Sequence, residues 1–249
     1  MGRPIVGGAL IDKPDDRDYP ISTLAYEYKT WNCLRLIEYV RDQKYNDCVI
    51  NTFNSCFEIE SILTYNKKIA INNVYGLSNG FGYTIARQAD NTFPNNIGLY
   101  PRDVVKQYHK VGISPEYFMP YDKYTLKSET NPKSKFAAHF FKIKRYEAVT
   151  VDQLPLVLSS QKPVCIAINI DGNFLKYNTN SEPLQETDGK NLGGHAILAV
   201  GVNYTYNDKI IITALNSWGN GLGQQGLWRM SLDYIRKVSG NRIFWSIYI

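Results

Sequence analysis

Two neighbouring runs in the second half of the chain constrain it more than any other feature. The first, GGHAILAVG at residues 193–201, begins with two glycines and a histidine and continues as an apolar strand. The second, LNSWG at residues 215–219, ends the next β-rich run with an asparagine and a tryptophan. The pattern predicts that His195 and Asn216 lie on neighbouring strands, and such a pair usually serves a cysteine nucleophile.

Position singles out one of the four cysteines. Cys48 follows Asp47, a candidate helix cap, so its sulfur would lie at the positive end of the helix dipole, which favours a thiolate. An isolated free cysteine is more often a small buried hydrophobic residue. We interpret Cys33, Cys56 and Cys165 in that way because they adjoin or lie within apolar runs.

His195 is the best of three histidines as the partner of the cysteine. His109 falls at the polar end of a predicted helix, and His139 lies in FAAHFF, where a structural role is the simpler interpretation. The glycines before His195 allow close backbone approach, so its imidazole could face a cleft. Asn216 could then accept a hydrogen bond from the ring and set its tautomer.

Two further side chains complete the predicted site. Trp218 could shield the bond between histidine and asparagine from water. Gln43 lies five residues before Cys48 and could donate its amide to an oxyanion, together with the backbone N–H of Cys48. The alternative for Gln43 is an ordinary loop glutamine.

The order of the elements indicates an α+β protein. Apolar residues cover most of a predicted helix at 47–66, and a second helix is predicted at 101–111, where Pro101 suits the first position. After the polar stretch 123–135 the pattern changes to β-rich runs, which we predict as strands 144–149, 163–169, 195–202, 209–217, 226–230 and 244–249, with a helix near 151–160. A helical lobe beside an antiparallel β lobe leaves a cleft between them, where sites commonly form.

We therefore predict one domain over residues 1–249. Its helical lobe spans approximately 23–130, and its β lobe combines 1–22 with 131–249. Within the latter, residues 8–22 are expected to form an extended arm on the surface, too short for an inhibitory prosegment.

Composition excludes several classes of protein. Hydrophobic residues make up 44% and charged residues 20%, which argues for a packed chain. The net positive charge of +5 is too small and too dispersed to predict a nucleic-acid partner. Neither a membrane span nor a secretory signal is recognised. The cysteines lack the paired spacing of a disulfide or metal framework, so we expect no cofactor, no metal and a reducing compartment.

At the residues named above the chain resembles the papain family of cysteine peptidases, especially bacterial and viral members without the usual disulfides. The resemblance is strongest over GGHAILAVG and LNSWGNGLGQQGLWRM; DKPDDRDYP, VRDQ before the nucleophile and GLYPRDVVKQYHKVGISPEYFMPYD resemble further segments of the family. It implies a two-lobe papain-like fold with a central nucleophile helix and a β-barrel-like second lobe. It also implies Cys48 as nucleophile, His195 as proton-transfer partner, Asn216 as orienting residue, Gln43 as oxyanion donor and Trp218 as cover for Asn216.

The chain departs from the family around the nucleophile. The family usually has a glycine-rich loop of six residues from glutamine to cysteine, whereas QKYNDC has five and no glycine. Asp47 replaces a small neutral residue, and its charge would raise the pKa of the neighbouring thiol. Glu58, ten residues after Cys48, supports the register because the family's central helix also carries a glutamate there.

The leading hypothesis is a cysteine-type peptidase that cleaves a protein or peptide substrate through a thioester acyl-enzyme. A catalytically impaired papain-like binding module is the alternative, because the loop before Cys48 is shortened. Amide transfer to an amine would use the same acyl-enzyme. The chain is expected to be cytoplasmic or virion-associated, and the sequence leaves its oligomeric state open.

Overall fold

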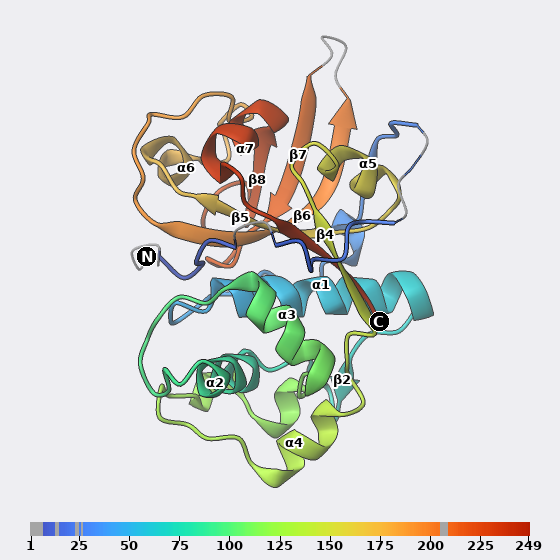
Figure 1. Ribbon diagram of the computed structural model, residues 1–249, viewed down its shortest axis with the longest axis vertical. Helices are drawn as coiled ribbons and strands as arrows, with labels where there is room; N and C mark the ends of the chain where they lie inside the picture. Colours follow the sequence, from blue (N-terminus) through green and yellow to red (C-terminus); the bar gives the residue numbers. More distant parts are fainter. Residues whose placement is uncertain (1–6, 13–14, 23–24, 26, 205–208) are drawn as a thin grey trace.

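In the computed structural model of the protein, the residues described are 7–12, 15–22, 25, 27–204 and 209–249. A long helix, α1 (Cys48–Tyr65), runs through the middle of the molecule. A predominantly antiparallel sheet lies on one side of α1 and a group of shorter helices on the other (Figure 1). This is the α+β arrangement that the sequence predicts.

In the described part of the chain, the main sheet has seven strands in the order β4-β9-β5-β6-β7-β8, with β1 paired to β6. Their bounds are β1 (Trp31–Asn32), β4 (Arg145–Val149), β5 (Val164–Asn169), β6 (Gly194–Tyr204), β7 (Ile210–Leu215), β8 (Leu227–Ser231) and β9 (Phe244–Tyr248). Every pair is antiparallel. The six predicted strands therefore match β4 to β9, each to within a few residues.

Both faces of the sheet are covered, which explains its apolar sequence runs. Alternation along β5 turns Cys165 and Ala167 toward the core that contains α1, and Val164, Ile166 and Ile168 toward a second core. That second core contains residues of α5 (Leu154–Ser159) and α7 (Leu232–Ser239). The strands consequently lack the polar face of a half-exposed sheet.

The central helix α1 is buried for most of its length because apolar and small side chains surround it. From Cys48 to Phe57 every residue is buried, so the helix contacts the sheet and the other helices at once. Asn66 ends it in the left-handed conformation, with its N–H donating to Ile62 and Ser61 carbonyls.

The helices on the other side of α1 include two that are not predicted from the sequence, one before and one after the predicted helix at 101–111. They are α2 (Asn79–Ala89), α3 (Pro101–Lys110) and α4 (Pro132–Ala138), joined by the turns η2 (Glu116–Phe118) and η3 (Tyr121–Lys123). In α2, Gly80 and Gly82 argue against a helix, yet a Cβ at Gly82 would lie 2.3 Å from the Tyr108 hydroxyl. Close packing thus requires the residue that weakens the local helix signal.

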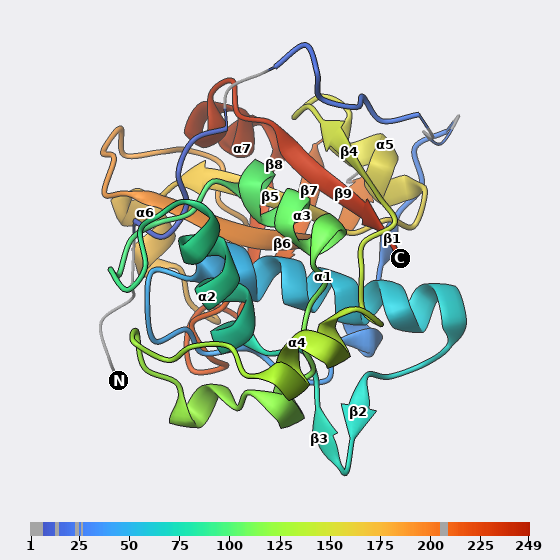
Figure 2. The same ribbon diagram turned by 60° about the horizontal axis from the view of Figure 1, so that its bottom comes forward.

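Helix α4 was identifiable in principle, because Asn131 and Ser134 form a reciprocal capping box with Pro132 at the first turn. The remaining elements are η1 (Leu34–Leu36), the hairpin of β2 (Ala70–Ile71) and β3 (Val74–Tyr75), and α6 (Gly172–Lys176). Figure 2 shows the hairpin projecting from the helical side, while α6 lies beside the sheet.

Candidate active site

Cys48 is the first residue of α1, and its sulfur faces the start of β6. The backbone N–H of Ala196 donates to its Sγ over 3.4 Å, which places the sulfur beside the backbone of the residue after His195. The predicted cap does not form: Asp47 occupies the cap position, but its side chain makes no capping hydrogen bond. The side chain of Cys48 is completely buried.

His195 and Asn216 come together as the pattern of the strands predicts. Nε2 of His195 lies 2.7 Å from Oδ1 of Asn216, so the ring donates to the amide oxygen when its proton is on Nε2. Within the described part of the chain, the buried Nδ1 has no hydrogen-bond partner, Cys48 included. Nδ1 is the nitrogen that would accept a proton from the thiol, and no hydrogen bond from a described residue engages it.

Trp218, which is predicted to cover the hydrogen bond between His195 and Asn216, lies over the imidazole of His195. The two rings stack with centroids 4.5 Å apart and planes inclined by 24°. Phe174, on α6, contacts both rings edge-on at 6.3 Å from His195 and 5.7 Å from Trp218. The sequence pattern gives no sign of Phe174, because α6 is only five residues long and joins this site through tertiary packing.

The shortened loop before Cys48 keeps Gln43 close to the other predicted residues. The backbone N–H of Gln43 donates to the carbonyl of Ser217 over 2.8 Å, and Gln43 Oε1 accepts from Ser217 Oγ over 2.7 Å. Its amide Nε2 donates to the carbonyl of Tyr45 over 3.0 Å. Asn46, at the end of the loop, is held by two hydrogen bonds to Asn96.

The arm at residues 7–10 covers the sulfur, whereas the sequence analysis expects residues 8–22 to lie on the surface. A Cβ at Gly8 would lie 2.7 Å from Cys48 Sγ, and a Cβ at Gly194 would lie 2.0 Å from the carbonyl oxygen of Ala9. The expectation is therefore wrong at Gly8, Ala9, Asp12 and Ile21, which are buried. Gly8 and Gly194 have no Cβ and therefore allow the arm to approach Cys48 and β6 closely. The acidic residues farther along the arm give no sign of this close approach.

The arm joins the two sides of the molecule by backbone hydrogen bonds. The N–H groups of Gly7 and Ala9 donate to the carbonyl of Gly194 over 2.9 and 3.3 Å. On the helical side, Leu10 N donates to Leu99 O over 2.9 Å, and Leu99 N donates to Gly8 O over 3.0 Å. The arm thus occupies the place where a cleft is expected.

This cover has an electrostatic consequence. Burial raises the pKa of the Cys48 thiol to about 12, although the hydrogen bond from Ala196 opposes the shift. Burial also lowers the pKa of His195 to about 4, partly offset by its bond to Asn216. At neutral pH both groups are uncharged in this closed arrangement, because water is excluded from both.

Asp47 adds a buried carboxyl group next to Cys48. Its Oδ2 accepts from the Tyr121 hydroxyl over 2.6 Å, and its buried Oδ1 has no partner in the described residues. Burial raises the pKa of Asp47 to about 7, with the Tyr121 bond opposing the shift. When ionised, Asp47 raises the pKa of Cys48, as the sequence analysis expects.

Replacement of Asp47 by asparagine is expected to change how stability depends on pH. Since the native carboxyl has a pKa above its ordinary value of 3.8, the native state holds a proton that the unfolded state loses between about pH 4 and 7. Stability therefore falls as pH rises through this window. We expect the free energy of unfolding of Asp47→Asn, measured by urea denaturation, to rise relative to that of wild type by up to about 4 kcal/mol between pH 4 and 8. A constant difference across that range would contradict the assignment.

Neither a metal-binding cluster nor a membrane-spanning helix is found among the described residues. No group of three or more histidine, cysteine, aspartate or glutamate side chains there could hold a metal ion. Among those same residues, no helix is both long and apolar enough to cross a membrane.

The sequence of residues 54–241 matches the papain family of cysteine proteases, and the chain belongs to that family. The matched region contains His195 and Asn216 but begins six residues after Cys48. The match therefore establishes the family without covering Gln43 or Cys48.

Individual relatives agree with this class. An uncharacterized peptidase C1-like protein of Acanthamoeba polyphaga mimivirus is 25% identical over 213 residues, which span 80% of this chain and 66% of that protein. The chain thus spans just under two thirds of that relative.

Solved structures share the papain-like two-lobe fold. Xylellain, a cysteine protease from Xylella fastidiosa, has a TM-score of 0.76 at 23% identity, over 99% of this chain and 97% of that one. A procathepsin B from Trypanosoma congolense has a TM-score of 0.75 at 14% identity, over 98% and 86%. At these identities the likeness concerns the fold.

Proposed function

We propose that this chain hydrolyses peptide bonds with Cys48 as nucleophile and His195 and Asn216 as its partners. The observation that carries the proposal is the 2.7 Å contact between His195 Nε2 and Asn216 Oδ1, with Nδ1 unoccupied and Cys48 Sγ beside the Ala196 N–H. One imidazole nitrogen is thereby oriented, while the other remains for proton transfer.

The proposed reaction follows from these positions once the arm has left the sulfur. His195 Nδ1 takes the proton of Cys48, and the thiolate forms a C–S bond with the peptide carbonyl carbon. Gln43 Nε2 and the N–H of Cys48 donate to the oxyanion, and His195 returns the proton to the departing amine as the C–N bond breaks. Water then hydrolyses the thioester, releasing the acid and restoring the thiol.

A non-catalytic papain-like module is the second candidate, and one observation favours it. The Gln43 amide donates to the Tyr45 carbonyl within the shortened loop, so the oxyanion donor is engaged in the closed arrangement. An amide nitrogen carries two N–H groups, and the peptidase proposal requires one of them to reach the oxyanion. The two candidates differ in the reactivity of Cys48.

A thiol-directed peptide probe, followed by mass spectrometry of the labelled peptides, separates the candidates. For a peptidase we expect Cys48 to be labelled faster than the buried Cys33, and His195→Ala to slow labelling of Cys48 by at least about 10-fold. The control His139→Ala alters an exposed histidine outside the site and should leave the rate unchanged. Equal labelling of Cys48 and Cys33, in the full chain and also in a chain without residues 1–9, would favour the non-catalytic module.

Substrate turnover completes this test. Incubation with an unfolded protein should yield new peptide termini with the wild-type chain and none with Cys48→Ala. An added amine would appear in the products if the acyl group were transferred rather than hydrolysed.

A further inference from the structure

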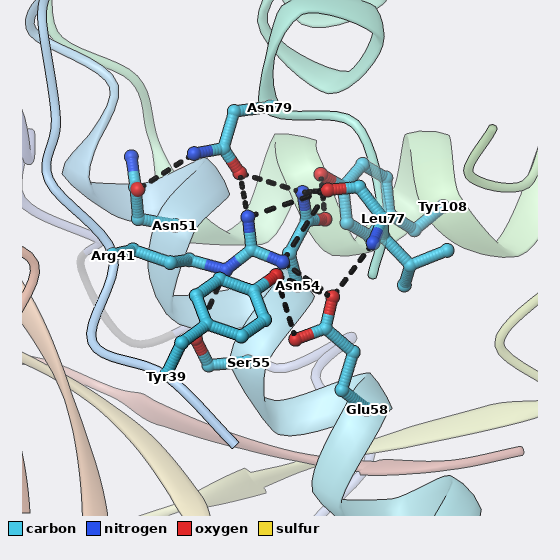
Figure 3. A network of polar contacts seen from close by, with 9 residues as sticks. All are labelled: Tyr39, Arg41, Asn51, Asn54, Ser55, Glu58, Leu77, Asn79 and Tyr108. Atoms are coloured by element: carbon cyan, nitrogen blue, oxygen red, sulfur yellow. Dashed lines mark hydrogen bonds and ion pairs between the residues drawn. The ribbon is translucent and has the colours of Figure 1, made fainter. Parts of the chain in front are cut away.

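The segment that carries Gln43 is anchored by a buried arginine, Arg41, two residues earlier. Arg41 is 7% exposed, and its guanidinium lies between α1 and the start of α2 (Figure 3). It forms an ion pair with Glu58 and donates to Ser55 Oγ over 3.2 Å and to Asn79 Oδ1 over 2.7 Å. Both Nη1 and Nη2 also donate to the carbonyl of Leu77 over 3.3 Å. Each guanidinium nitrogen therefore has an acceptor.

The acceptors of Arg41 are themselves held in place. Glu58 accepts from the backbone N–H of Leu77 over 2.6 Å, and Asn79 donates to Asn51 over 2.7 Å and accepts from Asn54 over 2.8 Å (Figure 3). Asn51, Asn54 and Glu58 all belong to α1, the helix that begins with Cys48. The network consequently fixes Arg41 to the helix that carries the nucleophile.

The backbone of the same segment is tied to the opposite side of the site. The carbonyl of Arg41 accepts from Gly219 N over 2.9 Å, and Gln43 N donates to Ser217 O over 2.8 Å. These bonds enclose a bridge between Asp42 and Trp218. The segment 41–43 therefore links α1, through the Arg41 side chain, to residues 217–219 next to Asn216.

We propose that Arg41 is a positioning residue for Gln43, holding the oxyanion donor in register with both Cys48 and the strand end at Asn216. This inference rests on the peptidase function proposed above. An oxyanion donor works only within a few tenths of an ångström of its productive place, and loss of one donor costs about 10²- to 10³-fold in kcat in other hydrolases. The guanidinium is buried among protein acceptors, so Arg41 acts through Gln43 and not on the substrate.

Lysine at this position tests the idea because it keeps the charge and loses the planar fork. An ammonium has three donors for acceptors that now receive bonds from three separate nitrogens. We expect Arg41→Lys to lower kcat by about 10-fold with KM within about 2-fold, because the interaction lost is one with the transition state. Ser55→Ala removes one acceptor only and should move kcat in the same direction by a smaller factor.

Two inhibitors distinguish positioning from general damage to the fold. A peptide aldehyde forms a hemithioacetal whose oxygen needs the oxyanion donors, so its affinity should fall in parallel with kcat. Iodoacetamide alkylates the thiol without an oxyanion, so its rate at Cys48 should be unchanged in Arg41→Lys.

Glu60→Gln is the matched control. Glu60 also lies on α1 and makes a partly buried ion pair, with Lys162 at 2.6 Å, but shares no hydrogen bond or ion pair with Arg41 or Gln43. It should leave kcat and aldehyde affinity near wild type. Wild-type kcat in Arg41→Lys, or an equal loss of alkylation and hydrolysis, would overturn the positioning role. Absence of hydrolysis by the wild-type chain would instead overturn the proposed peptidase function.

Discussion

Deletion of residues 1–9 is expected to increase the rate at which iodoacetamide alkylates Cys48 by about 10- to 100-fold at neutral pH. The deletion removes three backbone hydrogen bonds of the arm, with a net value of about 1 kcal/mol each, partly offset by the entropy of ordering it; a remainder of about 2 kcal/mol corresponds to about 30-fold. Exposure to water would also lower the pKa of the thiol from its raised value, because burial is the main cause of the shift. The deletion keeps Asp12, which accepts from Trp245 Nε1 over 2.8 Å.

A point substitution tests the same contact without shortening the chain. Gly8→Val would bring a Cβ to 2.7 Å from Cys48 Sγ, so the arm must leave the sulfur, and alkylation should accelerate as in the deletion. Ile11→Ala is the control, because Ile11 is half exposed and lies outside the segment 7–10. Unchanged alkylation in both the deletion and Gly8→Val would mean that the arm does not limit access to Cys48.

Replacement of Asn216 by alanine is expected to lower kcat/KM for peptide hydrolysis by about 10²-fold or more. In the proposed mechanism, Oδ1 of Asn216 holds the proton on His195 Nε2, and Nδ1 is left to receive the proton of Cys48. Without this acceptor the ring can rotate or take the other tautomer, a change that costs up to about 10⁴-fold in a related kind of triad. Steady-state kinetics with a peptide substrate measure the effect.

Aspartate at the same position separates orientation from simple loss of packing. Asn216→Asp keeps an oxygen acceptor, and Asn216 Nδ2 makes no hydrogen bond within the described residues, so that variant loses no donated bond. It should retain more activity than Asn216→Ala, with a pH profile shifted upward because the carboxylate favours the imidazolium. Asn203→Ala alters an exposed asparagine on β6 and should behave as wild type. Equal activity of Asn216→Ala and wild type would exclude an orienting role.

Much of the architecture was predictable because it depends on local patterns. The all-round apolar surface of 48–65 predicts a central helix, and the uninterrupted apolar runs of β5 and β6 predict strands buried on both faces. The helix α2 was not predictable, because its two glycines reduce the local helix propensity. Only the packing of Tyr108 and Tyr124 against these glycines explains why they are there. Propensity is a weak signal wherever tertiary contacts decide the residue type.

The residues of the candidate site likewise include some that the sequence predicts and some that it does not. His195, Asn216 and Trp218 were predictable as neighbours, because adjacent antiparallel strands bring their ends together. Arg41 and Phe174 were not, because each reaches the site from an irregular or very short element through contacts with distant residues. The catalytic roles of His195 and Asn216 and the positioning role of Arg41 are predictions that the experiments above test.

The sequence by itself determined the family, the α+β class and the side chains that a thiol hydrolase would need, because residue types and their spacing along strands and helices are local properties. Only the tertiary structure decided that Gly8 covers Cys48 and that Arg41 connects α1 with the segment of Gln43. Both are contacts between segments far apart in the chain or in different elements. They depend on burial and close approach, which have no period along the sequence.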